Sequence, residues 1–498
     1  MDQVLYNSTR GGETGVTASR AILKGLAADG GLFVPDHIPA LDKSVAELAG
    51  KKYQEIAYEV MKLFFTDFTE EELKACINAA YDEKFDAEEI VPLTKAGNDY
   101  YIELYHGATI AFKDMALSIL PHLMTTSAKK NNIKDKIVIL TATSGDTGKA
   151  ALAGFADVPG TGIIVFFPKD GVSYIQKRQM VTQKGANTAV VGIDGNFDDA
   201  QRGVKEMFGN KELEAKLSAS GIRFSSANSI NIGRLIPQIA YYVYTYTKLL
   251  AEGEIAQGEK MDVCVPTGNF GNILAAYYAK CMGLPIENLI CASNDNKVLY
   301  DFFKTGKYDR NREFMLTISP SMDILISSNL ERLIYKMAGE DAAKTAELMN
   351  ALKEGGVYTV TPEMKAKISE FVGLFATEDE TKAAIKDLYE KTNYVIDTHT
   401  GVAAAAVAKY KKEYGADRKI MIASTASPYK FARSVMTAID PAYDSLDEWA
   451  LIDKLSEITD TELPPAIKDI KDAEVLHKTE CATADMQKTV EDIISKQF

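Results

Sequence analysis

The sequence predicts an α/β protein in which helices cover both faces of a parallel sheet. From residue 136 onward, short runs rich in β-branched side chains alternate with helical stretches, a pattern that indicates strand–helix–strand units. Most of these runs are almost continuously apolar, which is typical of strands buried on both faces. The length of 498 residues corresponds to about two to four domains, each able to bury a core of its own.

Residues 1–100 are predicted to form a mainly helical region ahead of the first strand. The stretches Tyr53–Phe65 and Thr69–Tyr81 mix acidic and apolar residues in the manner of helices. Thr69 and Glu72 have the spacing of a capping box, in which each residue satisfies a free backbone amide at the start of a helix. We therefore expect a helix to begin at this point.

Six runs in the rest of the chain are predicted strands. They are Lys136–Leu140, Gly162–Phe167, Thr188–Ile193, Asp262–Val265, Asn288–Ala292 and Lys419–Ala423. Residues 301–397, by contrast, look helical and irregular, and we expect an insertion or a peripheral subdomain there. The tail after Ser445 is acidic and helix-prone, so we expect it to pack on the rest of the protein and assign it no chemistry.

Charge and composition exclude several classes of function. Acidic residues outnumber basic ones, 70 against 56, for a formal charge of −14, which argues against general binding to nucleic acid or anionic membranes. No two of the five cysteines form a CxxC pair, so neither a zinc site nor a disulfide framework is indicated and we expect no metal. No segment approaches the roughly 18 apolar residues of a membrane span, and the polar N-terminus lacks a signal-peptide pattern. We therefore expect a cytoplasmic protein whose partner is a small molecule.

Three loops of Gly, Ser, Thr and Asn each follow a predicted strand and lead into a helix. They are Thr141–Gly148, Pro266–Asn272 and Ser424–Pro428. Ligands bind at the carboxyl ends of parallel strands, and free amides at helix N-termini attract anions. The first loop fails as a Walker A motif, because Thr143 stands where Gly is needed and Ala150 where Ser or Thr is needed. Taken singly, each loop is about as well explained by an ordinary helix cap or turn.

One lysine breaks a local rule. Lys113 follows the apolar residues Ile110–Phe112, and a helix is predicted to start at Asp114. A lysine is unfavourable at this pole of a helix, and both the pole and burial lower the pKa of an ammonium group. A neutral amine of this kind suits a Schiff base with an aldehyde. A surface lysine is the commoner alternative, but a residue that breaks a local rule is more often functional. His106 is the histidine closest to it in sequence.

Taken together and in order, six segments resemble the threonine synthase family, within the fold-type II (tryptophan synthase β-like) pyridoxal-phosphate (PLP) enzymes. They are Asn7–Gly11, His106–Asp114, Thr141–Gly148, Ala227–Arg234, Pro266–Asn272 and Ser424–Phe431. The length and the long insertion are similar to the longer subgroup of this family. The resemblance implies an α/β fold of two parallel-sheet, three-layer domains, with an N-terminal helical region and helical insertions.

The resemblance also implies domain boundaries. The expected division is an N-terminal region 1–100, a large PLP-binding domain of 101–130 and 226–445 with the insertion at about 301–397, a small α/β domain 131–225, and a helical tail 446–498.

The same resemblance implies a role for each matching residue. Lys113 would hold PLP as a Schiff base and later shuttle protons. The cofactor phosphate would lie on Gly268, Asn269, Phe270, Gly271 and Asn272, its ring nitrogen on Thr425, and its phenolic oxygen near Asp146. Thr143, Ser144 and Thr147 would hold the substrate carboxylate, and Asn228, Ser229 and Arg234 the substrate phosphate. An arginine suits a phosphate because its planar fork offers several donors.

The implied reaction converts O-phospho-L-homoserine and water to L-threonine and phosphate, the last step of threonine biosynthesis, in a monomer or homodimer. One alternative is another fold-type II reaction, such as serine or threonine deamination, which would have no use for the phosphate-binding segment Asn228–Arg234. The other is a catalytically inactive, PLP-binding relative. The presence of Lys113 argues against it, since a protein without chemistry needs no Schiff base.

Overall fold

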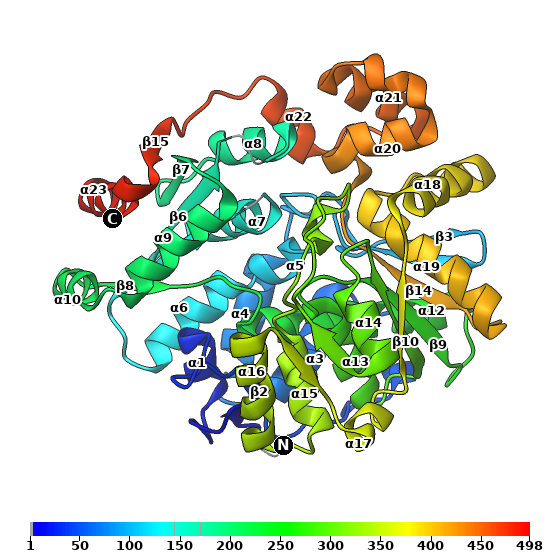
Figure 1. The fold of residues 1–498 in the computed structure, drawn as a ribbon, viewed down its shortest axis with the longest axis horizontal. Helices are drawn as coiled ribbons and strands as arrows, with labels where there is room; N and C mark the ends of the chain where they lie inside the picture. The colour runs from blue at the N-terminus through cyan, green and yellow to red at the C-terminus, as the bar shows by residue number, and fades with distance from the viewer. Residues whose placement is uncertain (1–2, 144, 170–171) are drawn as a thin grey trace.

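The chain folds around two sheets whose strands run mainly parallel, the smaller on the left and the larger on the lower right of Figure 1. The structure is a computed structural model that describes residues 3–143, 145–169 and 172–498. The larger sheet has the order β13-β10-β9-β14-β4-β3 and is parallel except for the β3–β4 pair. Its strands are β3 (Leu93–Ala96), β4 (Asp99–Glu103), β9 (Met261–Pro266), β10 (Ile286–Ser293), β13 (Phe371–Phe375) and β14 (Ile420–Ser424).

The smaller sheet has the order β15-β7-β6-β5-β8, and all of its pairs are parallel. Its strands are β5 (Lys136–Ala142), β6 (Thr161–Pro168), β7 (Thr188–Asp194), β8 (Ile222–Ser225) and β15 (Thr479–Ala482). All six predicted strands are confirmed within two residues at either end. The sequence analysis did not predict β4 or the strands at the four sheet edges, which are β3, β13, β8 and β15. An edge strand is covered by fewer neighbours, so it need not be continuously apolar.

Alternating side chains of the larger sheet pack into two cores. Cys264 and Ile290 face α19 (Thr398–Tyr414), in the same apolar cluster as Ala403 and Val407 of that helix. Their neighbours along the strands, such as Val263, face the opposite core. That core contains α12 (Ile239–Ala251) and α13 (Gly271–Cys281). The larger sheet is thus the middle layer of three, as the fold class requires.

The smaller sheet is also the middle of three layers. Its residues Val138, Leu140, Ile164 and Phe166 share a cluster with residues of three helices. Those helices are α9 (Phe197–Gly209), α10 (Lys211–Ala219) and α23 (Met486–Gln497). The other face is covered by α6 (Leu120–Lys130), α7 (Asp146–Phe155) and α8 (Tyr174–Val181).

The N-terminal region is mainly helical and supports the larger sheet through α12. Its elements are β1 (Tyr6–Ser8), α1 (Ala18–Lys24), β2 (Phe33–Pro35), α2 (Val45–Leu48), α3 (Tyr53–Phe64) and α4 (Glu70–Ala80). The predicted capping box is present, since the Thr69 side chain accepts from the Glu72 backbone amide and Glu72 accepts from Thr69 in return. Helix α3 packs on α12.

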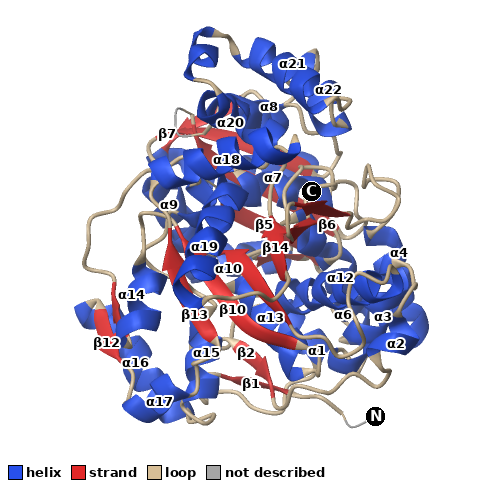
Figure 2. Cartoon of the chain, turned by 90° about the vertical axis from the view of Figure 1, so that its right-hand side faces the viewer, coloured by secondary structure: helices blue, strands red, loops and turns tan. Residues whose placement is uncertain are grey.

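Residues 301–397 lie at the β13 edge of the larger sheet. Figure 2 shows α16, α17 and β12 at the periphery of the molecule. The elements are α14 (Val298–Thr305), β11 (Lys307–Asp309), α15 (Leu330–Met337), α16 (Ala342–Gly355), β12 (Val357–Thr359), α17 (Pro362–Ala366) and α18 (Glu378–Thr392), together with β13. This segment therefore supplies an edge strand of the main sheet besides peripheral helices. It also carries the short helical turn Pro320–Met322.

The tail returns to the smaller sheet, as the red end of the chain shows in Figure 1. It contains α21 (Glu448–Thr459), α22 (Pro465–Lys471), β15 and α23. Strand β15 pairs with β7, and Val490 of α23 is fully buried against the sheet. The domain boundaries given above stay a prediction. Within the described residues, no helix is both long and apolar enough to cross a membrane.

Candidate active site

Lys113 lies at the carboxyl end of the larger sheet, the edge where ligands bind in open parallel sheets. The Phe112 backbone N–H donates to the Thr425 carbonyl, 2.8 Å away, directly after the end of β14. The next residue, Lys113, is the N-cap of α5 (Asp114–Leu117), so the helix starts where the sequence predicted. Thr425 is itself buried. The backbone hydrogen bond of Phe112 therefore holds the segment that carries Lys113 against Thr425, the predicted partner of the cofactor ring nitrogen.

The Lys113 amine is largely shielded from solvent. Only 12% of its side chain is exposed, and Nζ lies 3.2 Å from Ser321 Oγ and 3.5 Å from Asp146 Oδ2. Burial lowers the Lys113 pKa; Asp146 opposes this shift, and the charges of Lys430 and Arg234 add to it. The net direction is downward, which favours the neutral amine that can attack an aldehyde.

The glycine-rich loop lies on the other side of Ser321. A Cβ atom on Gly268 would come within 2.7 Å of the Ser321 carbonyl oxygen, and the Ser327 hydroxyl donates to the Gly268 carbonyl at 2.7 Å. The turn Pro320–Met322 is therefore in contact with Gly268 through its backbone and with Lys113 through its side chain. Lys113 and the loop thus lie on either side of the same turn, which is compatible with the predicted Schiff-base site.

The loop itself is built to present backbone amides. Phe270 has φ of 66° and is fully buried, and its ring packs against Phe303 and Phe371. Helix α13 begins at Gly271, and within the described residues no side chain caps it. The Ile273 amide donates to Asn272 Oδ1 at 2.9 Å. The amides of Gly271 and Asn272 are available to an anion, in the manner of phosphate sites at helix N-termini.

The two asparagines of the loop differ in their contacts. The Asn269 carbonyl accepts from the backbone and side chain of Asn329, at 3.0 and 2.9 Å. Asn272 is buried and its amide donates back to the Pro266 carbonyl at 3.3 Å. The Asn269 backbone and the Asn272 side chain help to hold the loop, whatever they contribute to a ligand. A largely shielded amine near a loop with free amides fits PLP, which carries an aldehyde and a phosphate.

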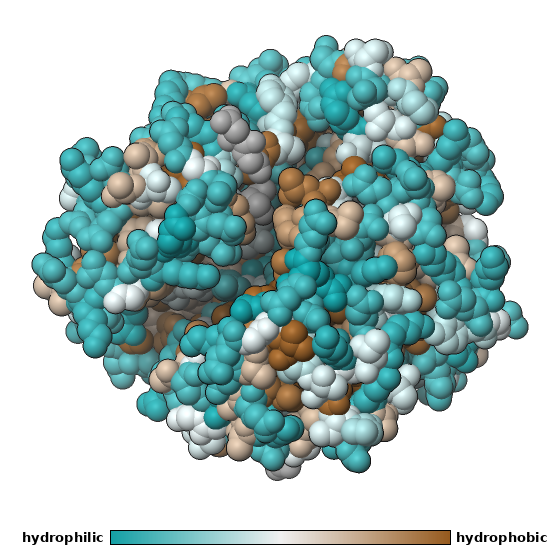
Figure 3. Space-filling model, viewed as in Figure 1, coloured by the Kyte–Doolittle hydropathy of each residue, from teal (hydrophilic) through white to brown (hydrophobic). Residues whose placement is uncertain are grey.

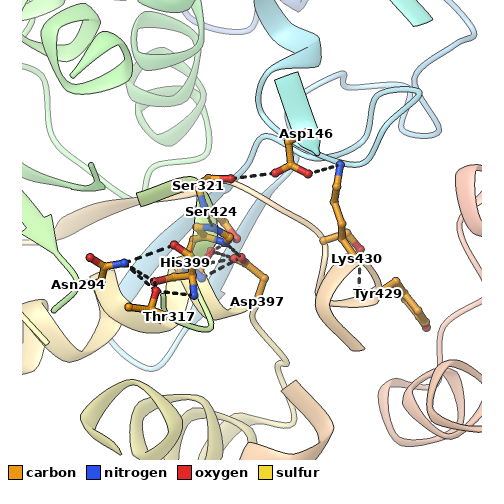
Figure 4. Close-up of polar contacts among 12 residues, drawn as sticks. Asp146, Asn294, Thr317, Ser321, Asp397, His399, Ser424, Tyr429 and Lys430 are labelled. Carbon is orange, nitrogen blue, oxygen red and sulfur yellow. Dashed lines mark hydrogen bonds and ion pairs between the residues drawn. The ribbon is translucent and has the colours of Figure 1, made fainter. Parts of the chain in front are cut away.

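Asp146 contacts both Ser321 and Lys430 (Figure 4). It is the first residue of α7 and is 6% exposed. Its carboxylate accepts from Gln176 at 2.8 Å and from the Ser321 hydroxyl at 2.9 Å, and Lys430 Nζ lies 3.0 Å away. Burial alone would raise the Asp146 pKa, but Lys430, Lys113 and Gln176 outweigh it and hold the pKa well below its usual range. Asp146 is therefore ionised and can only accept hydrogen bonds.

Two residues of the site, Lys430 and Ser321, were not singled out by the sequence analysis. Lys430 lies inside the matching segment Ser424–Phe431, where a buried lysine could have been suspected. Its side chain has no exposed surface, and Nζ donates to the Thr109 carbonyl at 2.8 Å. Ser321 lies in the region interpreted as an insertion, and no local pattern marks it.

A histidine–aspartate pair stands behind Ser321 (Figure 4). The Ser321 backbone N–H donates to His399 Nε2 at 3.1 Å, and His399 Nδ1 lies 2.7 Å from Asp397 Oδ2. Asp397 is fully buried and caps the start of α19. No local pattern in the sequence singles out His399.

The residues expected to hold the substrate carboxylate lie at the start of α7. The Thr143 hydroxyl accepts from the backbone amides of Gly145 and Gly148, each at 3.0 Å, and so acts as a cap for the helix. Thr147 is half-buried in the first turn. Ser144 falls outside the described residues. Asp146, in this same loop, connects it directly to Lys113.

Arg234 is the strongest candidate for an anion contact. It is 4% exposed on α11 (Ile232–Leu235), and one Nη donates to the Ala227 carbonyl at 2.9 Å. Its Nε is buried without a hydrogen-bond partner among the described residues, and burial lowers the Arg234 pKa to about 10. An unpaired buried donor is costly, so this group fits a ligand acceptor. Its neighbours Asn228 and Ser229 are exposed and half-buried, respectively, and they bond to each other at 3.3 Å.

The site gathers cationic side chains in a protein that is acidic as a whole. The charges of Lys430 and Arg234 both act on Lys113, and Lys430 is paired with the carboxylate of Asp146. Figure 3 shows the surface hollowed between the part built on the smaller sheet and the rest of the molecule. A local cation cluster of this kind supplies the attraction for an anionic substrate that the whole-molecule charge does not. Within the described residues, no group of three or more His, Cys, Asp or Glu side chains could hold a metal ion.

Comparison with known proteins agrees with this geometry. Residues 5–81 match the family described as Threonine synthase N terminus, and residues 91–425 match Pyridoxal-phosphate dependent enzyme. The threonine synthase of Schizosaccharomyces pombe is 38% identical over 474 residues, which cover 89% of this chain and 90% of that protein. The chain belongs to the threonine synthase family.

Two further relatives show how far the fold and the length of this chain agree with known proteins. A crystal structure of PLP-bound threonine synthase from Brucella melitensis has a TM-score of 0.88 and 34% identity, covering 99% of this chain and 100% of that one. The Homo sapiens protein Threonine synthase-like 1 is 40% identical over 434 residues and 84% of this chain. The match spans only 58% of the length of that protein. The predicted α/β, fold-type II architecture and the predicted PLP cofactor of the family are confirmed by these comparisons.

Proposed function

We propose that this protein is a threonine synthase, an enzyme that converts O-phospho-L-homoserine and water to L-threonine and phosphate with the help of PLP. The observation that carries the proposal is the position of the largely shielded Lys113 amine. It lies against Ser321 and Asp146, and Ser321 in turn contacts Gly268 of the phosphate-type loop. The names of the S. pombe and Brucella relatives support the same activity.

The proposed cofactor site follows from the same contacts. Lys113 would hold PLP covalently, the amides of Gly268–Asn272 its phosphate, and Thr425 its ring nitrogen. When bound, PLP supplies an electron sink for charge that develops at the substrate carbon atoms. Asp146 would stand near the phenolic oxygen, and its paired cation Lys430 makes that position tolerable for a second negative group.

The chain's own side chains would do the rest. With the substrate in place, Lys113 Nζ would accept the proton from the substrate Cα as a general base. Arg234 would hold the substrate phosphate through its free Nε and stabilise it as it leaves, a type of contact worth roughly 3–4 kcal/mol per donor. Thr143, Ser144 and Thr147 would hold the carboxylate, while Asn228 and Ser229 would complete the phosphate site.

Two alternatives remain to be separated by experiment, a serine or threonine deaminase and an inactive PLP-binding relative. The unpartnered donor of Arg234 favours the phosphate ester over a plain hydroxy amino acid. We also propose a cytoplasmic location, a monomer or homodimer as the working unit, and the domain division given above. All five cysteines are free thiols in the described structure, which suits a reducing compartment.

The test is a product assay with purified full-length protein and PLP. O-phospho-L-homoserine should yield phosphate and L-threonine in equal amounts, while L-serine and L-threonine should yield little ammonia. Lys113→Ala should abolish both products. Ammonia release from L-threonine without turnover of the phosphate ester would favour the deaminase. PLP binding with no turnover of any of the three substrates would favour the inactive relative.

A further inference from the structure

We propose that Ser321 is a positioning residue that sets the direction of the Lys113 amine, and that the Asp397–His399 pair holds Ser321 in place from behind. The inference rests on the proposed function, because it assumes that Lys113 is the residue that attaches PLP. It concerns a turn in the segment 301–397, where the matching motifs assign no role. Figure 4 shows Ser321 between Asp146 and His399, and the directions of its hydrogen bonds follow from the chemistry of these partners.

The direction of the Ser321 hydroxyl is fixed by Asp146. An ionised carboxylate can only accept, and three donors besides Lys113 converge on Asp146: Gln176, Lys430 and the Ser321 hydroxyl at 2.9 Å. The Ser321 proton therefore points to Asp146. The oxygen has only lone pairs left for Lys113, whose Nζ lies 3.2 Å away and must be the donor.

The direction of the backbone of Ser321 is fixed by His399. The Ser321 N–H donates to His399 Nε2 at 3.1 Å, so this nitrogen carries no proton. The ring proton is then on Nδ1 and points to Asp397 Oδ2, 2.7 Å away. Asp397 is held in turn by the backbone amides of His399 and Thr400 at 2.9 and 3.0 Å. The buried Asp397 carboxylate thus selects the His399 tautomer whose Nε2 accepts from the Ser321 N–H.

The turn is also tied to the end of β10. The Asn294 side chain donates to the Ser319 carbonyl at 3.4 Å and to Asp323 Oδ1 at 2.8 Å. Asp323 accepts from Thr317 as well, through its backbone amide at 3.0 Å and its hydroxyl at 2.8 Å. Both flanks of the turn Pro320–Met322 are therefore anchored, which leaves Ser321 little freedom to rotate away from Lys113.

The consequence concerns the lone pair of the amine. A neutral Lys113 has two N–H groups, and Ser321 and Asp146 offer acceptors for both at 3.2 and 3.5 Å. The lone pair is then directed away from these two groups and is free for the cofactor aldehyde. In the attachment step Nζ attacks the aldehyde carbon, a C=N bond forms, and the carbonyl oxygen leaves as water with the two amine protons. The other charged groups that act on Lys113, Lys430 and Arg234, are both cations.

The experiment compares two ligands on full-length apoprotein. PLP reports attachment, followed by its visible absorbance and by borohydride trapping, while pyridoxine 5′-phosphate carries an alcohol in place of the aldehyde and reports binding alone. In Ser321→Ala we expect PLP attachment to slow about 10- to 100-fold, as for a misdirected reacting group, with pyridoxine phosphate affinity changed less than about 2-fold. Ser321→Thr, which keeps a hydroxyl, should restore most of the rate.

The Asp397–His399 part has its own matched pair of variants. His399→Leu removes the acceptor for the Ser321 N–H and should reproduce the slow attachment of Ser321→Ala. His399→Gln offers a side-chain oxygen in its place and should be closer to wild type. The inference is overturned if Ser321→Ala attaches PLP at the wild-type rate. It is also overturned if Ser321→Ala and Ser321→Thr both lose affinity for PLP and for pyridoxine phosphate to the same extent. A wild-type protein that binds pyridoxine phosphate but never attaches PLP would instead overturn the proposed function.

Discussion

Lys430 Nζ lies 3.0 Å from Asp146 Oδ1, and neither side chain is more than 4% exposed. The two residues belong to different parts of the protein. Lys430 lies in the turn Pro428–Phe431 after the larger sheet, whereas Asp146 begins the helix that follows β5 of the smaller sheet. The pair therefore joins the two sheets at the active site and keeps a carboxylate ionised where water cannot solvate it.

Lys430→Met should destabilise the protein strongly. The change keeps the length of the side chain but leaves the Asp146 charge without its nearest cation, and breaking a buried pair on one side costs about 3–5 kcal/mol. The measurement is the free energy of unfolding in urea. The double variant Lys430→Met/Asp146→Asn should recover much of the loss, and Lys391→Met, in an exposed pair, should change it by about 0.5 kcal/mol or less. A loss in the double variant equal to the sum of the single losses would contradict the coupling.

His106 should make the folded protein less stable as the pH rises into the alkaline range. Burial alone lowers its pKa, but hydrogen bonds to Asp86 and Glu103 outweigh burial and raise the pKa from its usual 6.5 to about 9. Because the folded-state pKa is the higher one, the contribution is fully present below about pH 6.5 and is lost as pH rises through 9. The difference corresponds to roughly 3 kcal/mol.

The check is urea unfolding at several pH values for wild type and His106→Gln. The variant should show a smaller loss of stability between neutral and alkaline pH. His37→Gln is the control, since His37 pairs with Asp36 on the surface, and it should retain the wild-type profile. An unchanged profile in His106→Gln would refute the assignment.

Gly268→Ala should damage the site by a steric effect. The added methyl group would lie 2.7 Å from the Ser321 carbonyl oxygen, a backbone atom that must move to admit it. Overpacking of this kind typically costs about 1–3 kcal/mol. The binding free energy of PLP should weaken by at least the same amount. Gly209→Ala, where nothing lies within 4 Å, should be neutral or slightly stabilising. Fluorescence titration with PLP and urea unfolding measure the two effects, and normal PLP affinity in Gly268→Ala would count against the contact.

Arg234→Lys should weaken the substrate phosphate site. Lysine keeps a positive charge but loses the Nε donor and the planar fork, so the affinity for O-phospho-L-homoserine and for inorganic phosphate should fall about 10- to 100-fold. PLP binding should be retained. Arg223→Lys, an exposed arginine paired loosely with Asp135, is the control and should behave as wild type. If phosphate inhibits Arg234→Lys and Arg223→Lys equally, Arg234 does not bind the substrate phosphate.

Much of the architecture could be predicted because the central strands are buried on both faces. Runs such as Lys136–Leu140 must be apolar throughout, and they were recognisable for that reason. The edge strands were not, because a segment such as Thr479–Ala482 is polar and partly exposed. Only its pairing with β7 makes it a strand, and pairing is a property of the folded chain.

Some residues of the candidate site could likewise be recognised from the sequence, and others could not. Lys113 stood out because a helix start is an unfavourable place for a lysine, and the glycine-rich loop because its composition is local. Ser321 and His399 could not be found in this way. They are 78 residues apart in sequence, and they reach the site only through the fold. Lys430 lay in a recognised segment, but its burial, which gives it its significance, is not visible in the sequence.

Which lysine carries PLP is the most direct question about the proposed function. Three shielded lysines compete. Lys430 and Lys149 are buried, and burial lowers the Lys149 pKa to about 7, whereas 12% of the Lys113 side chain is exposed. Reduction of the PLP-loaded protein with borohydride, followed by peptide mapping, separates them by mass. We expect the label on Lys113 and its loss in Lys113→Ala. A label on Lys149 or Lys430 in the wild-type protein, or none at all under saturating PLP, would contradict the account.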